Sequence, residues 1–101
     1  MKAVQVRYTV QESFVAQNRA NIEKVMAALR ANPIPGMFYS SHTVDDGRTF
    51  VHINIARDGE TLSRLQQVQE FQDFRAALKA SAPEVPPKAT DLHPVAAGFE
   101  I

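Results

Sequence analysis

The sequence predicts one α+β domain, because segments with strand periodicity alternate with two segments of helix periodicity in a short chain. With 101 residues, the chain has the usual size of a single domain around a single core. Hydrophobic residues make up 45% of it, a fraction typical of globular proteins. We therefore treat residues 1–101 as one domain. A domain of this size buries only about two thirds of its unfolded surface, so pairing with a second copy would add apolar burial.

Strand periodicity is clearest in the first half of the chain. Residues 3–10 alternate apolar and polar side chains, which is typical of a half-buried strand. Their apolar face holds Val4, Val6, Tyr8 and Val10. Residues 37–44 and 49–56 are two further strands, joined by a hairpin turn at Asp45-Asp46-Gly47. Residues 89–101 are predicted as a last, irregular strand, and Pro94 inside it favours an edge position or a bulge.

Two segments have the periodicity of amphipathic helices. Residues 12–31 carry one apolar stripe and end at the proline-rich segment 32–36. A second helix follows Asp58-Gly59, with a predicted break near residues 66–69. Its apolar positions are Leu62, Leu65, Val68, Phe71, Phe74 and Leu78. The order strand, helix, strand, strand, helix, strand predicts a ferredoxin-like βαββαβ domain with both helices on one side of the sheet.

The two faces of strand 49–56 differ in chemistry. Val51, Ile53 and Ile55 form its strongly apolar face, and we expect this face to lie under the helices. The opposite face then holds Phe50, His52 and Asn54. The pairing with strand 37–44 has two alternatives. If a two-residue loop pairs residue 41 with residue 52, Tyr39 and Ser41 share the face of His52 and Asn54, and His42 points to the other face. If a three-residue loop pairs residue 40 with residue 52, the two histidines share a face. The first register is weakly favoured, because it allows Phe38 and Val44 to pack in the core with Val51 and Ile53.

Composition excludes several kinds of protein. Eleven basic and eleven acidic residues give no net charge, and no basic face is present to bind nucleic acid or a membrane surface. The absence of cysteine removes disulfides and thiolate sites, and three dispersed histidines do not predict a metal site. The opening residues turn polar at once, unlike a signal peptide, so a cytoplasmic location is expected.

Four segments of the chain form a recognisable set: Gln5-Val6-Arg7-Tyr8, Asp46-Gly47-Arg48-Thr49-Phe50-Val51-His52-Ile53, Phe71-Gln72-Asp73-Phe74 and Pro86-Pro87-Lys88-Ala89-Thr90-Asp91-Leu92. With these segments the chain resembles the small dimeric α+β barrel proteins of the antibiotic-biosynthesis monooxygenase-like superfamily. The resemblance implies a four-stranded antiparallel sheet of order 4-1-3-2 and a homodimer in which two sheets face each other. It also implies a ligand between sheet and helices or at the barrel mouth, and chemistry on aromatic molecules with O₂ and no built-in cofactor.

His52 and Asn54 are the candidate catalytic residues, because residues two apart on a strand point to the same side. A histidine can move a proton near neutral pH, and an asparagine can hold a carbonyl or an oxyanion. Arg7 offers a fork of donors for a carboxylate or phenolate. The other candidate ligand-binding residues are Tyr39, Phe50, Phe71 and Phe74. A plain structural role for His52, inside a dimer interface, is the competing interpretation.

Two functions remain open at this point. The first is a cofactor-independent, monooxygenase-like enzyme that acts on a small aromatic or apolar molecule. The second is a non-catalytic dimeric protein that binds a small ligand or takes part in a stress response. The His52–Asn54 pair beside an apolar helix favours the first, and the lack of tryptophan, which characterised oxygenases of this kind use, favours the second.

Overall fold

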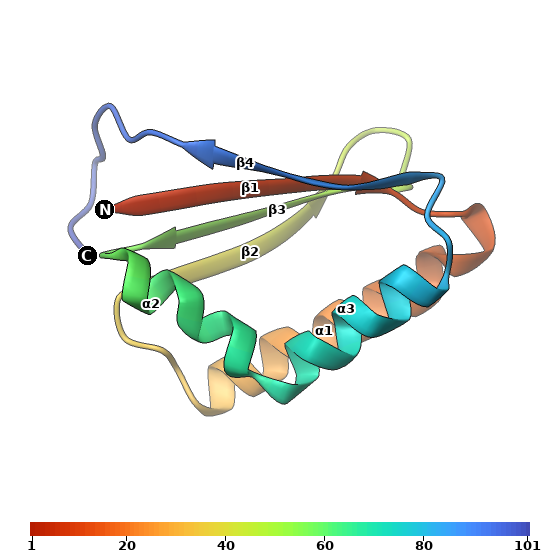
Figure 1. Cartoon of the computed structure of the whole chain (residues 1–101), viewed down its shortest axis with the longest axis horizontal. Helices are drawn as coiled ribbons and strands as arrows, with labels where there is room; N and C mark the ends of the chain where they lie inside the picture. Colours follow the sequence, from red (N-terminus) through yellow and green to blue (C-terminus); the bar gives the residue numbers. More distant parts are fainter.

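A computed structural model describes all residues, 1–101, and contains one four-stranded sheet with helices against one side (Figure 1). The strands are β1 (Lys2–Thr9), β2 (Met37–Thr43), β3 (Thr49–Ala56) and β4 (Val85–Leu92). The helices are η1 (Glu12–Phe14), α1 (Val15–Ala31), α2 (Gly59–Ser63), η2 (Arg64–Gln67) and α3 (Gln69–Ala80). The order β2-β3-β1-β4 is the predicted order 4-1-3-2 written in reverse, and every pairing is antiparallel. The ferredoxin-like α+β fold is therefore confirmed.

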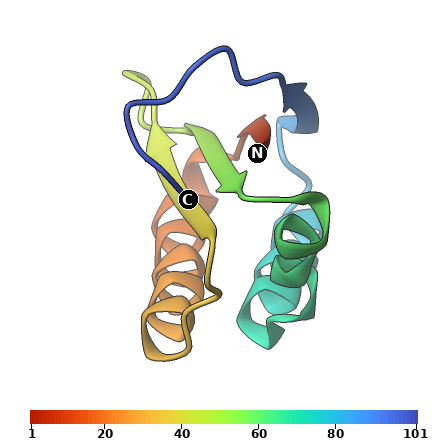
Figure 2. The same cartoon turned by 90° about the vertical axis from the view of Figure 1, so that its left-hand side faces the viewer.

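The two long helices lie side by side below the sheet (Figure 2). Their apolar stripes and the near face of the sheet enclose one core, which has Tyr8, Val25 and Phe50 among its most buried side chains. The predicted break in the second helix is confirmed, since Val68 is extended between η2 and α3. Asp58 caps α2 by accepting a hydrogen bond from the backbone of Thr61, which fixes where the chain leaves β3. No helix is both long and apolar enough to cross a membrane.

The assignment of the faces of β3 was wrong. His52 and Asn54 lie under the helices, 3% and 4% exposed, whereas Ile53 is only half-buried on the opposite face. The register of β1 explains the arrangement, because Val6 pairs with His52 and Tyr8 pairs with Phe50 on the core side. The most apolar face of the strand thus points away from this chain's own core.

The hairpin register follows the favoured alternative, because Ser41 pairs with His52 and Tyr39 with Asn54. His42 is therefore on the helix-free face and exposed. The turn is held by the Asp46 carboxylate, which accepts from the backbone N–H groups of Arg48 and Thr49 at 2.8 Å. The hydroxyl of Thr49 also donates to this carboxylate, at 2.7 Å, and it contributes most to holding the pKa of Asp46 well below its usual value, at about 2; the two backbone bonds add to the effect.

The last strand begins earlier than predicted and ends before Pro94. It covers Val85–Leu92 and includes Pro86 and Pro87, at the edge of the sheet beside β1. An edge strand tolerates prolines because one side of it needs no donors, and the pairing with β1 shifts register between Arg7 and Thr9. The residues after β4 cross the helix-free side of the sheet (Figure 2), where the rings of Phe99 and Phe38 lie 6.4 Å apart.

Candidate functional site

A cleft of about 1110 Å³ lies between the core face of the sheet and the segment from α2 to α3. Its floor is formed by β1, β3 and β4, which present Val6, His52 and Ala89. The rings of Phe71 and Phe74 on α3 form an apolar wall, with their centroids 6.0 Å apart. Drug-sized ligands bind in clefts of this kind, which are mostly apolar with a few converging polar groups.

The polar groups of this cleft form a buried hydrogen-bond relay centred on His52. Its Nε2 lies 2.7 Å from the hydroxyl of Tyr8, and its Nδ1 lies 2.7 Å from the hydroxyl of Tyr39. Asn18 on α1 donates from Nδ2 to the Tyr8 oxygen at 2.9 Å. A longer contact of 3.4 Å joins Ser41 Oγ to His52 Nε2. The chain Asn18–Tyr8–His52–Tyr39 therefore runs from the interior of the core to the cleft, and we call it the relay.

Every member of the relay is neutral at neutral pH, and burial secures this for His52. Desolvation lowers the pKa of His52 to about 4, with a smaller contribution from the charge on His42. Desolvation also raises the pKa of Tyr8 and of Tyr39 well above the usual tyrosine value. Aromatic packing adds to the enclosure, since the His52 ring lies 5.3 Å from that of Tyr8 and 5.4 Å from that of Phe74. At neutral pH the relay holds hydrogen bonds without charge.

Asn54 contributes an unsatisfied acceptor. Its side chain is 4% exposed and lines the cleft, yet its Oδ1 has no hydrogen-bond partner in the protein. Leaving a buried acceptor unpaired costs about 1–3 kcal/mol, so such groups need a reason. A ligand hydroxyl or N–H in the cleft would satisfy this oxygen.

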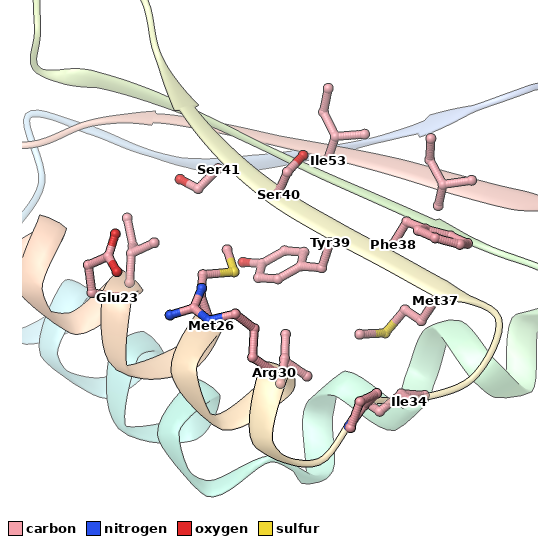
Figure 3. Close-up of a pocket in the computed structure, with 14 residues that line it drawn as sticks. Glu23, Met26, Arg30, Ile34, Met37, Phe38, Tyr39, Ser40, Ser41 and Ile53 are labelled. Atoms are coloured by element: carbon pink, nitrogen blue, oxygen red, sulfur yellow. The ribbon is translucent and has the colours of Figure 1, made fainter.

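A second hollow, of about 640 Å³, flanks the edge strand β2 (Figure 3). Met26 and Arg30 of α1 lie on one side of it, and Phe38 and Ile53 lie beyond the strand on the helix-free face (Figure 3). Because its lining comes from both faces of β2, this hollow wraps around the edge of the sheet and is less enclosed than the cleft. Tyr39 lines both spaces.

Solved structures of other proteins share the fold of this chain. Rv0793 from Mycobacterium tuberculosis is 19% identical and superposes with a TM-score of 0.82, covering 97% of this chain and 98% of that one. A protein solved as an antibiotic biosynthesis monooxygenase is 12% identical, with a TM-score of 0.79 and coverage of 95% and 100%. The chain has the antibiotic biosynthesis monooxygenase-like fold. No family model and no curated protein matches the sequence.

One structure with the monooxygenase-like fold is of SnoaB, described as a cofactor-independent oxygenase, from Streptomyces nogalater. It is 17% identical, with a TM-score of 0.73, and the match covers 98% of this chain and 97% of that one. At this identity the likeness shows the fold, and the chemistry has to be argued from the residues of the cleft.

In this monooxygenase-like fold the predicted site residues divide between the two faces of the sheet. His52, Asn54, Tyr39, Phe71 and Phe74 come together in the cleft. Phe50 lies behind them, 2% exposed and stacked on Tyr8 at 5.5 Å, so it supports the relay and does not line the cleft.

Arg7 does not join the site. It pairs with Val51 on the helix-free face and is exposed, so the sheet separates it from His52. Two cations of α3, Arg75 and Lys79, line the cleft. The guanidinium carbon of Arg75 lies 5.9 Å from the centre of the Phe71 ring, and its Nη1 donates to Gln66. Sequence reasoning missed Arg75, and its position one residue after Phe74 gave no sign of the cleft.

Asn18 and Tyr8 were also missed as functional residues. Tyr8 was expected in the core, where it lies, but its hydroxyl partner His52 was assigned to the other face. Asn18 had a usable signal, because it lies four residues before Ile22 and seven before Val25 on the apolar stripe of the helix. A polar residue within such a stripe needs a buried partner.

Proposed function

We propose that this protein is a cofactor-independent oxygenase that binds a small aromatic enol or phenol in the cleft. The observation that carries the proposal is the buried Tyr8–His52–Tyr39 relay, which ends at the wall of an apolar cleft of substrate size. The likeness in fold to SnoaB, described as a cofactor-independent oxygenase, supports the same class of reaction.

Each group of the cleft has a role in the proposed reaction. The aromatic rings of Phe71 and Phe74 pack on the substrate ring, and the Asn54 oxygen accepts from a substrate hydroxyl. Tyr39 donates to the substrate oxygen on which negative charge develops, and this donor in a dry site stabilises the enolate. A substrate CH₂ beside the ring then becomes C=O, one oxygen atom of O₂ enters the product, and the other leaves as water.

His52 holds Tyr39 in place and does not take the substrate proton. A base with a pKa of about 4 is poorly matched to a phenol or enol, and both ring nitrogens are already bonded. The sequence-based hypothesis that neutral imidazole accepts this proton is therefore replaced. The substrate itself must be acidic enough to lose its proton to water near neutral pH, and Tyr39 then stabilises the anion that remains.

The test uses anthrone, a ring ketone with one reactive CH₂ group, as the probe. The wild-type protein should consume O₂ faster than buffer alone and yield the ketone product, which is heavier by one oxygen and lighter by two hydrogens. The readouts are an oxygen electrode and mass spectrometry, with an anaerobic sample as control. No O₂ consumption above the rate in buffer, for anthrone and for related hydroxylated ring ketones, contradicts the proposal.

Changing Tyr39→Phe should lower kcat/KM by roughly a hundredfold, the effect of removing one oxyanion donor. His52→Gln should lower it by about tenfold, because Tyr39 loses its fixed partner. His42→Gln is the matched control, since His42 lies exposed on the helix-free face and should leave the rate unchanged. Equal losses of kcat/KM in the two histidine variants would mean that His52 has no specific role in the reaction.

A binding protein without catalysis is the second candidate, and the neutral relay favours it. None of the relay groups carries a charge at neutral pH, so the cleft is suited to holding a polar ring compound unchanged. Native mass spectrometry of freshly purified protein separates the two functions. A co-purified small molecule that is released unaltered after exposure to O₂ supports binding alone.

We also propose that two copies pair through the helix-free face of the sheet. Val51, Ile53 and Ile55 are half-buried there, and Phe38 is 56% exposed, although no helix of this chain covers them. An apolar sheet face of this extent favours a partner surface in water. The same arrangement underlies the dimer that the sequence resemblance implies.

Changing Ile53→Glu is expected to weaken this dimer by roughly a hundredfold or more, because an unpaired carboxylate would be buried twice at the interface. Ala27→Glu, on the exposed side of α1, is the control and should leave assembly unchanged. Sedimentation at micromolar concentration gives the answer. A wild-type protein that sediments as a monomer is the contrary result.

A further inference from the structure

In each hydrogen bond of the relay one group donates and the other accepts. Asn18, at the inner end of the relay, determines which group donates in each bond. Asn18 is fully buried on α1, its Nδ2 donates to the Tyr8 oxygen, and its Oδ1 has no partner. Because the Asn18 amide gives Tyr8 a donor, the hydroxyl proton of Tyr8 must find another acceptor. The other hydrogen-bond partner of that hydroxyl is His52 Nε2, at 2.7 Å.

The tautomer of His52 links its hydrogen bond with Tyr8 to its hydrogen bond with Tyr39. If Nε2 accepts from Tyr8, it carries no proton, and the neutral ring has its proton on Nδ1. Ser41 Oγ, at 3.4 Å, is a second hydroxyl that can donate weakly to the same nitrogen. The Nδ1–H group donates to the Tyr39 oxygen at 2.7 Å. The hydroxyl proton of Tyr39 has no acceptor in the protein, and Tyr39 lines the cleft.

We infer that Asn18 is a positioning residue, which sets the relay so that His52 is protonated on Nδ1 and Tyr39 donates its proton into the cleft. The reverse arrangement needs the Tyr8 proton to point at Asn18, where the amide nitrogen is. For the ligand this inference rests on the proposed function, and it means that the ligand atom facing Tyr39 is an acceptor oxygen, a carbonyl or an enolate, and not a hydroxyl donor.

The tautomer of His52 tests the inference without any ligand or turnover. In the wild-type protein, labelled with ¹⁵N, long-range ¹H–¹⁵N correlation spectra distinguish a protonated ring nitrogen from a bare one. The His52 signals are identified by their loss in His52→Gln. We expect the Nδ1–H form in roughly tenfold excess or more, the population ratio of one buried hydrogen bond. A predominant Nε2–H form, or two comparable populations, overturns the inference.

Asn18→Asp tests the part played by Asn18, because an ionised carboxylate of the same size accepts and cannot donate. Once this carboxyl ionises, followed by its own carbon signal as pH rises, the Tyr8 proton should turn to it and the His52 proton should move from Nδ1 to Nε2. Asn21→Leu, on the same helix but bonded to Gln17, is the control and should keep the wild-type tautomer. A His52 proton that stays on Nδ1 after ionisation of the introduced carboxyl refutes the role of Asn18.

These spectra separate the two proposals. If the wild-type tautomer is Nδ1–H but no probe is oxidised, the relay direction stands and the oxygenase proposal fails. If anthrone is oxidised while His52 is protonated on Nε2, the oxygenase proposal stands and the direction is wrong. Should Asn18→Asp fail to fold, the wild-type spectrum alone still decides the direction.

Discussion

Changing Phe50→Ala is expected to destabilise the folded chain by about 3–5 kcal/mol, the usual loss for a phenylalanine removed from a well-packed core. Phe50 is 2% exposed, belongs to the core cluster and stacks on Tyr8 with an interplanar angle of 10°. For a domain of about 100 residues this loss corresponds to a fall in Tm of roughly 12 °C or more. Thermal and urea unfolding of dilute protein measure it.

Phe38→Ala is the matched control for Phe50→Ala. Phe38 lies on the neighbouring edge strand but points to the helix-free face, where it is 56% exposed. In the monomer its truncation should cost less than about 1 kcal/mol, since little buried surface is lost. The comparison is made below the concentration at which the chain dimerises, because a bound partner adds apparent stability. Equal losses for the two variants would contradict the assignment of the faces.

The contrast between these two phenylalanines shows what sequence periodicity can predict about a strand and what it cannot. Alternation along residues 49–56 correctly separates Phe50 and His52 from Val51 and Ile53. It does not show which set lies under the helices, and apolarity favours the wrong one, because Ile53 and its neighbours lie on a face left without helices. The fold class, the strand order and the hairpin register needed only local patterns and the family resemblance, and all three are confirmed.

The candidate site was predicted in part for a related reason. His52, Asn54 and Tyr39 were placed together correctly, because the hairpin register is a local property. Their partners depend on the packing of α1 against the sheet, which no spacing within the chain encodes. Asn18 reaches Tyr8 across that interface, and only its place in an apolar stripe hinted at a buried role.

Acid is expected to destabilise the protein through His52 by about 3 kcal/mol between neutral pH and pH 4. Burial lowers the pKa of His52 from 6.5 to about 4 in the folded chain. Between these two values the unfolded chain binds a proton at this residue and the folded chain does not. The free energy of unfolding therefore falls as the pH falls through this window, at about 1.4 kcal/mol for each unit of pKa difference. Above the unfolded pKa the contribution is fully present.

Between pH 6.5 and pH 4 the effect of His52 on stability can be measured separately from that of the carboxylates that also stabilise the fold. The pKa of Asp46, lowered to about 2 by its turn bonds, and that of Asp58, lowered by its bonds to Thr61, both lie below their usual value of 3.8. Their stabilising effect is lost only as the pH falls below that value, so it leaves the window nearly untouched. Tyr8 and Tyr39, the titratable groups bonded to the ring, stay neutral throughout, because even the usual tyrosine pKa of 10.0 lies far above this window and burial raises it further.

Urea unfolding of wild-type protein and of His52→Gln at several pH values measures this effect. Glutamine keeps a donor and an acceptor but does not titrate, so the variant should be less stable at neutral pH and nearly flat across the window. The free energies of unfolding of the two proteins should converge towards pH 4. Protonation of His52 removes from the wild type the stabilising contribution of the neutral histidine, which the variant lacks at every pH. Parallel curves would mean that His52 accepts a proton in the folded state near its ordinary pKa. The relay would then carry charge at mildly acid pH, and His52 would again be a candidate base for the substrate.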